Sequence, residues 1–253
     1  MQNYSHTIGH TAILAVVLGA AGTPALADII GFNNLAGWKP NQGDAQTPIS
    51  LPDPNTVQIT SQSGGQLRSI FYETRQSSAQ FTASFTYRAD QGSSNSQGAS
   101  FILQNDPAGP DALGGFGIGL GYAGIVNSIA TTWDLRTNTI GFSTGGVVAG
   151  GVPVVGIDLG SNNDIDFTLT YDGNFLTQRL VDTVTGVEFV QNNILVGDIS
   201  SFLGGDLAYV GFSATSLFSD QFFSNFRYTA IPAPGSLGLF TVGLCAVARR
   251  RRH

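Results

Sequence analysis

The sequence predicts an all-β protein, an antiparallel sandwich or barrel of about 200 residues. Apolar residues alternate with polar ones along many short segments, which is typical of strands with one buried face. Gly, Asn and Asp separate these segments, and 33 of the 253 residues are Gly. Helical periodicity is almost absent, while a hydrophobic content of 42% supplies enough apolar surface for a core.

Two segments show the alternation most clearly, 81–87 (FTASFTY) and 165–171 (IDFTLTY). In each, every second side chain is apolar and the residues between them are mostly Ser and Thr. Asp172-Gly173 follows the second segment, and an Asp-Gly pair permits the positive φ angles of a tight hairpin. The chain is therefore predicted to return along residues 175–181 as an antiparallel partner.

The remaining elements are short. Further strands are expected at 56–60, 67–72, 99–103, 128–135, 139–143, 152–157, 187–190, 207–214 and 222–228. One helical turn is expected at 198–203, capped by Asp198 and ended by Gly204-Gly205. No Pro-rich linker and no fixed repeat divides this stretch, so residues 28–230 are predicted to form one domain.

The rare residue types lie near the ends of the chain. The three His residues are His6, His10 and His253, and the only Cys is Cys245. A domain of residues 28–230 therefore has neither imidazole nor thiol, which excludes Ser-His or Cys-His catalysis and zinc sites built on His or Cys. Chemistry in this domain would depend on carboxylates, hydroxyls, amides and aromatic rings.

The N-terminus has the pattern of a secretory signal peptide. Residues 12–21 (AILAVVLGAA) form an apolar run of the right length, and Ala25 and Ala27 provide the small residues that signal peptidase accepts. Cleavage before Asp28 is predicted, although the segment lacks the usual Lys or Arg near its start. The alternative is a buried apolar strand.

The C-terminus has three parts: Pro232-Ala233-Pro234, an apolar stretch at 235–248, and an arginine block of Arg249, Arg250, Arg251 and Arg252. As a helix the apolar stretch spans about 21 Å, which makes it a marginal membrane span. This tail, residues 231–253, resembles the PEP-CTERM sorting signal, although Ala233 stands where the usual motif has Glu. The resemblance implies transient anchoring by a short transmembrane helix and removal by an exosortase. The alternative is an ordinary C-terminal anchor.

Both ends together predict export to the cell envelope, outer surface or extracellular matrix of a Gram-negative-type bacterium. The charge of the middle domain limits its partners there. Residues 28–230 hold seven basic and 17 acidic residues, a formal charge of −10. This charge disfavours nucleic acids and anionic lipid headgroups.

Several segments of the middle domain follow one another in a familiar order: 79–87 (AQFTASFTY), 98–106 (GASFILQND), 114–122 (GGFGIGLGY), 125–134 (IVNSIATTWD), 165–180, and 198–213 (DISSFLGGDLAYVGFS). In that order they resemble the strands and loops of the legume-lectin (L-type) domain. The last segment is the most specific, because a helical turn running into Tyr-Val-Gly-Phe-Ser is unusual. The resemblance implies an antiparallel concanavalin-like (jelly-roll) sandwich.

In that family, loops beside paired manganese and calcium sites bind sugar. Position by position, the resemblance implies Gln97, Gly114, Gly115 and Asn138 as carbohydrate-binding candidates. It also implies Asp134 and Asn138 as metal ligands. Gln97 replaces an Asp, Thr132 a Glu and Arg136 an aromatic residue, and the stretch with a second Asp and a His is missing. We therefore expect the paired-metal site to be lost or weakened, with calcium as the one candidate cofactor.

For several other residues the sequence leaves more than one role open. Residues 158–166 (DLGSNNDID) could ligate calcium or form a solvated turn. Asp164 and Asp166 are the only carboxylates spaced for a retaining glycosidase on one strand. Trp133 is expected in the core, whereas Trp38 could be exposed as a sugar platform or buried.

The function predicted is that of a non-catalytic, surface-sorted, lectin-like protein that binds or organises extracellular polysaccharide. The first alternative is a structural matrix protein that has kept the fold and lost the site. A glycoside hydrolase is the second alternative.

Overall fold

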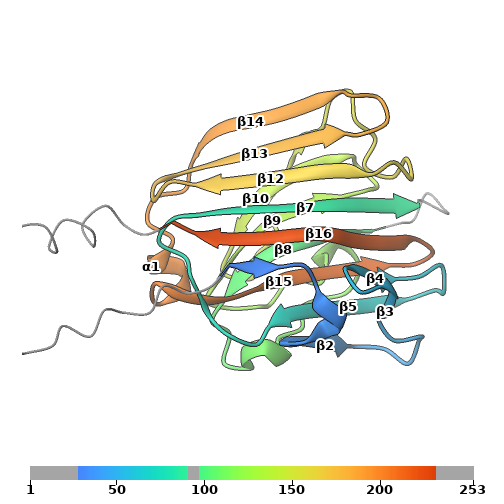
Figure 1. The fold of residues 1–253 in the computed structure, drawn as a ribbon, viewed down its shortest axis with the longest axis horizontal. Helices are drawn as coiled ribbons and strands as arrows, with labels where there is room; N and C mark the ends of the chain where they lie inside the picture. Colours follow the sequence, from blue (N-terminus) through green and yellow to red (C-terminus); the bar gives the residue numbers. More distant parts are fainter. Residues whose placement is uncertain (1–27, 91–96, 232–253) are drawn as a thin grey trace, which may run out of the picture.

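The computed structural model describes residues 28–90 and 97–231, which form two antiparallel sheets packed face to face (Figure 1). The predicted all-β sandwich is confirmed. The predicted signal peptide and the predicted sorting signal beyond Ile231 lie outside the described residues. Within the two described ranges, no helix has the length and apolar character needed to cross a membrane.

Each sheet runs through seven strands, with one short strand added beside it, and all pairings are antiparallel. Sheet A has the order β14 (Glu188–Leu195), β13 (Phe175–Asp182), β12 (Ile165–Tyr171), β7 (Phe81–Asp90), β16 (Asp220–Ala230), β4 (Thr56–Thr60) and β3 (Ser50–Asp53), with β1 (Ile29–Ile30) beside β16. Sheet B has the order β11 (Val152–Pro153), β10 (Thr139–Thr144), β9 (Ser128–Asp134), β8 (Gly98–Gln104), β15 (Leu207–Ser216), β5 (Gln66–Tyr72) and β2 (Trp38–Gln42), with β6 (Gln76–Ser77) beside β15.

Helical structure in the described residues is confined to single turns. These are three 3-10 turns, η1 (Asn33–Leu35), η2 (Gly109–Asp111) and η3 (Gly117–Gly119), and one α-helical turn, α1 (Ser200–Leu203). A helical turn is present within the predicted range, at Ser200–Leu203, and Gly204 ends it with φ of 71°. Its N-cap is Ile199, not Asp198, although Asp198 accepts a hydrogen bond from the Ser200 N–H at 2.9 Å.

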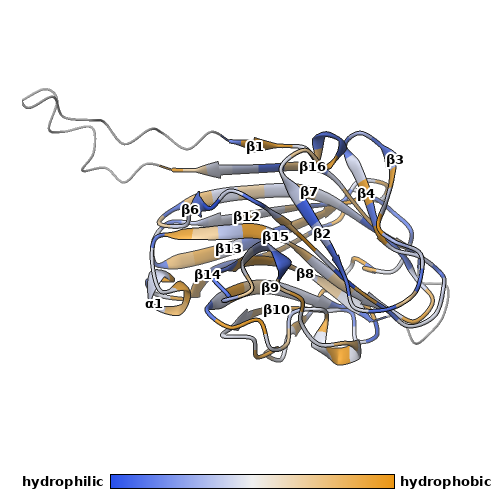
Figure 2. Ribbon diagram, turned by 90° about the horizontal axis from the view of Figure 1, so that it is seen from below, coloured by the Kyte–Doolittle hydropathy of each residue, from blue (hydrophilic) through white to orange (hydrophobic). Residues whose placement is uncertain are grey.

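The core lies between the two sheets, and Figure 2 marks the hydrophobic residues of their strands in orange. The alternation predicted at 81–87 places Phe81, Ala83, Phe85 and Tyr87 inside, all at most 2% exposed. Phe85 stacks on Phe167 of the neighbouring strand with ring centroids 4.9 Å apart. Aromatic pairs of this kind add to the burial of apolar area, so Phe85→Ala would cost about 3–5 kcal/mol of unfolding free energy.

A second apolar cluster lies on the outer face of sheet B, where a long loop covers the strands. Phe71, Ile102 and Ala130 of the sheet contact Tyr122 and Ile125 of this loop. Hydroxyl groups of the same face bind the loop backbone: Ser69 donates to the Ala112 carbonyl at 2.6 Å, Ser213 to Leu120 at 2.9 Å and Thr215 to Gly117 at 2.9 Å. The Gly-rich loop is therefore fixed on the sheet by both apolar and polar contacts.

Several strands depart from the prediction. Residues 152–157 were expected as one strand, but only Val152–Pro153 pairs, because Pro153 has no N–H and Gly156 turns the chain with φ of 83°. Strands β2 and β3 contain Pro40 and Pro52 and lack clear alternation, so the pattern gave no signal for them. Trp38, on β2, is buried and packs against Phe32 at a centroid distance of 5.0 Å. Trp133 is buried in the core as expected.

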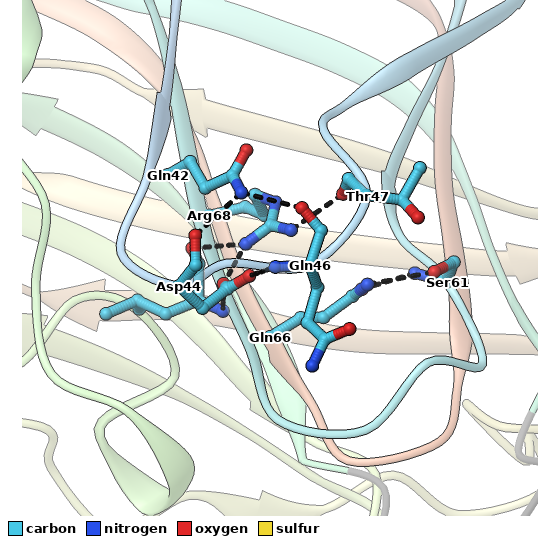
Figure 3. A network of polar contacts seen from close by, with 8 residues as sticks. Gln42, Asp44, Gln46, Thr47, Ser61, Gln66 and Arg68 are labelled. Atoms are coloured by element: carbon cyan, nitrogen blue, oxygen red, sulfur yellow. Dashed lines mark hydrogen bonds and ion pairs between the residues drawn. The ribbon is translucent and has the colours of Figure 1, made fainter.

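A buried polar network fixes the connection between β2 and β3 (Figure 3). Arg68 of β5 is fully buried; its guanidinium forms an ion pair with Asp44 and donates to the Thr47 carbonyl at 2.7 Å. The same Asp44 carboxylate accepts the Leu67 N–H at 2.8 Å, and the Gln42 amide donates to the Asp44 and Gln46 carbonyls, both at 2.7 Å. These bonds offset part of the desolvation of the charged side chain, whose Nε has no hydrogen-bond partner among the described residues.

Candidate functional site

A hollow of about 300 Å³ opens on the outer face of sheet B, over the ends of β9 and β10. We call it the sheet-B hollow. Strand residues form its floor, the β9–β10 turn and the 148–151 segment form its walls, and Leu120 of the Gly-rich loop closes one end. Its lining consists of Leu120, Thr132, Asp134, Thr137, Thr139, Gly141, Val148, Ala149, Gly150 and Gly151.

The polar floor follows from the alternation of the two strands. Thr132 pairs with Gly141 and Asp134 with Thr139, so these four share the outer face, while Trp133 and Ile140 between them enter the core. A Cβ atom on Gly141 would lie 3.1 Å from the Cα of Gly151, closer than side chains normally approach. The absence of a side chain at Gly141 therefore lets the 150–151 backbone lie close over the strand.

Asp134 is held by its neighbour Arg136. Its Oδ1 accepts hydrogen bonds from the Arg136 N–H at 2.8 Å and from Nε at 3.2 Å, and its Oδ2 accepts one from a terminal guanidinium nitrogen at 2.6 Å. The hydrogen bond to Asp134 raises the pKa of the Arg136 guanidinium above its usual value. A carboxylate has about four acceptor positions, so about one remains, on Oδ2, for a ligand in the hollow.

Asn138 points away from the sheet-B hollow. It adopts φ of 50°, and its Nδ2 donates to the Val154 carbonyl at 2.9 Å and the Ile157 carbonyl at 2.8 Å. Its Oδ1 accepts the Leu159 N–H at 2.9 Å. Both amide protons are thus used to hold the 154–159 segment, which fails to continue as the predicted strand.

Gly114 and Gly115 do not line the sheet-B hollow. Their N–H groups donate to the Gly121 carbonyl at 3.1 Å and the Ala123 carbonyl at 2.7 Å, so both donors are used within the loop. The loop reaches the hollow through Leu120.

Gln97 is buried at the start of β8, and its carbonyl accepts the Leu135 N–H at 2.8 Å. The next residue, Gly98, is paired with Asp134. The structure thus places Gln97 beside the β9–β10 turn, and of the predicted residues only Asp134 lies in the lining. A sugar contact by Gln97, Gly114, Gly115 or Asn138 remains a prediction.

The sequence interpretation missed most of the lining. Thr137, Thr139, Gly150 and Gly151 had no assigned role, and Thr132 was noted only as a departure from a motif. The available signal was the cluster of hydroxyl residues around Asp134, with Gly150-Gly151 beginning 11 residues after Thr139. Only the strand pairing shows that the two segments meet.

The carboxylates of 158–166 each have a different partner. Asp158 accepts the Gly160 N–H at 2.9 Å as in a turn, and Asp166 accepts the Thr86 hydroxyl at 2.6 Å. Asp164 lies 4.0 Å from a terminal nitrogen of Arg88. Across the described ranges, no group of three or more His, Cys, Asp or Glu side chains could hold a metal ion.

Known structures share this architecture, although the sequence matches no protein-family model and no curated protein sequence. Arcelin-5 of Phaseolus vulgaris, a lectin-like defence protein, superimposes with a TM-score of 0.65 at 16% identity over 80% of this chain and 96% of its own. The Bauhinia forficata lectin in complex with GalNAc gives the same four values. Lectin I-B4 of Griffonia simplicifolia in its metal-free form gives a TM-score of 0.63 at 18% identity, over 80% and 98% of the two chains.

This chain has the legume-lectin fold. The expected concanavalin-like sandwich is confirmed, and at these identities the likeness concerns the fold alone. The similar structures named here are lectins or lectin-like.

The legume-lectin fold raises the question of a metal, and the donor set around Asp134 does not fit calcium. Calcium takes six to eight oxygen ligands, several of them charged. Here one carboxylate is largely used by an arginine, whose positive charge also opposes a second cation at that place. The Asn138 oxygen already accepts a backbone N–H, and no second carboxylate lines the hollow.

Proposed function

We propose that this chain is a surface-exported, lectin-like protein that binds a neutral saccharide of extracellular polysaccharide in the sheet-B hollow, without catalysis. The observation that carries the proposal is the lining itself: one oriented carboxylate, three threonine side chains and the Gly150-Gly151 backbone around a shallow hollow. Sugar hydroxyls both donate and accept hydrogen bonds, so they match such a surface. The legume-lectin fold supports carbohydrate binding, and the ends of the sequence support export.

In this proposal Asp134 accepts a hydrogen bond from a sugar hydroxyl, and Arg136 positions the carboxylate. The Thr137 and Thr139 hydroxyls, 2.8 Å apart, provide further donors and acceptors, whereas the buried Thr132 hydroxyl is hydrogen-bonded to Ser143 at 3.2 Å. Leu120 and Val148 offer apolar contact to the C–H face of the ring. The calcium ion is not required, because Arg136 supplies the positive charge that holds Asp134 in place.

The test is a glycan array and a polysaccharide pull-down with the purified full-length chain, with and without calcium. Wild type is expected to retain neutral glycans in both conditions, and Asp134→Asn is expected to lower retention about tenfold, which corresponds to about 1.4 kcal/mol. The matched control is Glu188→Gln, which removes a carboxylate from another arginine pair, with Arg179 at 3.0 Å on sheet A. Absence of binding to every glycan by the folded protein would refute the proposal.

A second function is favoured by one specific observation. The N–H groups of Gly114 and Gly115 and the amide protons of Asn138 are all used internally. A structural matrix protein that keeps the fold without a sugar site would show this arrangement. It predicts that Asp134→Asn changes neither glycan retention nor the assembly of the protein with its matrix.

A further inference from the structure

A second hollow lies on the opposite side of the sandwich, on the outer face of sheet A. Its volume is about 210 Å³, and it crosses the sheet from the start of β12 to β3. We call it the sheet-A hollow. Its lining consists of Pro52, Asp53, Thr56, Thr86, Arg88, Asp164, Phe222 and Ser224.

The register of the strands builds this surface. Arg88 of β7 pairs with Phe222 of β16, and Thr86 pairs with Ser224, so all four project from one face. The guanidinium carbon of Arg88 lies 4.6 Å from the centroid of the Phe222 ring. A cation over an aromatic ring is attracted to it, which orients the guanidinium without using its N–H donors.

Arg88 keeps its hydrogen-bonding capacity. Its guanidinium makes no hydrogen bond to any residue of the described ranges, and the nearest carboxylate oxygen, of Asp164, is 4.0 Å away. The Nε atom is buried, whereas the Arg88 side chain as a whole is 41% exposed. Exposed terminal nitrogens of this kind can donate to acceptor oxygens of a ligand.

Hydrogen-bond acceptors lie at both ends of the sheet-A hollow. The Thr56 hydroxyl and then the Asn55 N–H lower the pKa of the Asp53 carboxyl, so Asp53 is ionised at neutral pH. Asp164 stands at the other end of the hollow, and the Ser224 hydroxyl lies between them. Two carboxylates against one guanidinium disfavour an anionic ligand, whereas a neutral polyol can accept from Arg88 and donate to the carboxylates.

We propose that the sheet-A hollow is a second saccharide site, selective for a neutral pyranose ring, so that one chain holds two glycans on opposite faces. The inference rests on the proposed function, because it assigns the same ligand class to a second place. The hollow is below the roughly 300–1,000 Å³ of sites for drug-sized ligands, which suits a single sugar ring. Two sites on opposite faces allow a single chain to bridge polysaccharide strands and raise avidity.

The test measures stoichiometry per chain, which does not depend on the oligomeric state. Equilibrium dialysis of the full chain uses methyl α-galactoside, methyl α-glucoside and glucuronate as probes. We expect wild type to bind two equivalents of a neutral glycoside and no glucuronate. Arg88→Gln and Asp134→Asn are each expected to bind one equivalent, and the double variant none.

The control is Arg179→Gln, which removes another arginine from the same face and should leave two equivalents. Ser224→Tyr fills the sheet-A hollow while keeping Arg88, and should also leave one equivalent if Arg88→Gln does not fold.

One equivalent in wild type, abolished by Asp134→Asn and unchanged in Arg88→Gln, overturns the second site while the proposed function stands. Binding of glucuronate that Arg88→Gln abolishes overturns the neutral class. No binding of either neutral glycoside by folded wild type overturns the proposed function and the second site together.

Discussion

Two aspartate–arginine pairs in this protein have the same chemistry and different surroundings. Arg68 is fully buried beside Asp44, and five further hydrogen bonds tie that pair to neighbouring residues (Figure 3). The two carboxylates are similarly exposed, Asp134 17% and Asp44 14%, but Arg136 is 32% exposed at the β9–β10 turn, where Asp134 lines the sheet-B hollow. The buried pair joins segments 24 residues apart, whereas the partly exposed pair joins residues two apart.

The difference indicates which pair serves the fold and which serves the site. Removing one partner of a buried pair leaves an uncompensated charge, which is strongly destabilising. Removing one partner of an exposed pair costs little stability, because water replaces it. A side chain whose loss leaves the fold intact is free to be selected for ligand binding.

The largest effect is expected from Asp44→Ala. Arg68 would stay buried without its carboxylate, so the free energy of unfolding should fall by about 3–5 kcal/mol. Chemical denaturation measures this change. The double variant Asp44→Leu with Arg68→Met should recover a large part of the loss, and a loss of under about 1 kcal/mol in Asp44→Ala would show that the pair behaves as a surface pair.

The next effect is expected from Asn138→Ala, which leaves the Leu159 N–H and two carbonyls without their partner. Such losses cost about 1–3 kcal/mol, and Ala also tolerates the positive φ poorly. Thermal and chemical unfolding check this value. Asn138→Gly separates the two causes, since it relieves the backbone and keeps only the hydrogen-bond loss. If Asn138→Ala reduced glycan retention at unchanged stability, Asn138 would instead contact the sugar.

Arg136→Gln should change binding more than stability. Asp134 would lose its orientation, so retention of neutral glycans should fall about tenfold, while the unfolding free energy changes by less than about 1 kcal/mol. Arg136→Lys should not restore binding, because an ammonium cannot reproduce the fork geometry. The matched control is Lys39→Gln, which breaks the exposed pair with Asp111 at 3.1 Å. A large loss of unfolding free energy in Arg136→Gln would show instead that this pair stabilises the fold, as the Asp44–Arg68 pair does.

The smallest effect is expected from adding or removing calcium. Because Arg136 holds the carboxylate that a metal would bind, millimolar calcium or a chelator should leave the melting temperature and glycan retention unchanged. A bound ion would raise stability by about 3–4 kcal/mol at 100 to 1,000 times its dissociation constant, a shift of several degrees. Calorimetry with and without the chelator, together with metal analysis, distinguishes the two cases.

The local alternation of apolar and polar residues was enough to predict most of the strands. The alternation at 81–87 and 165–171 specifies which side chains enter the core, and the Asp-Gly pair specifies the hairpin between β12 and β13. Strand β2 could not be found in this way, because Trp38 enters the core beside Lys39 and Pro40, where periodicity gives no signal.

The candidate site was predictable only in part. Asp134 was predicted from the resemblance to the legume-lectin pattern, but its pairing with Arg136 depends on the turn geometry of residues 135–138. The walls of the sheet-B hollow depend on the 148–151 segment folding back over β10, a contact between residues distant in sequence. Likewise, nothing in the local sequence around Arg88 shows that Phe222 will lie beside it.

The order of the strands also constrains how the domain can form. β15 and β16 are the last strands of the domain, yet β15 lies between β8 and β5 and β16 between β7 and β4. Each sheet thus remains split in two until residues 207–230 are available, and non-local strand pairing of this kind is intrinsically slow. During synthesis, the polypeptide would therefore stay open until nearly all of the domain has emerged from the ribosome.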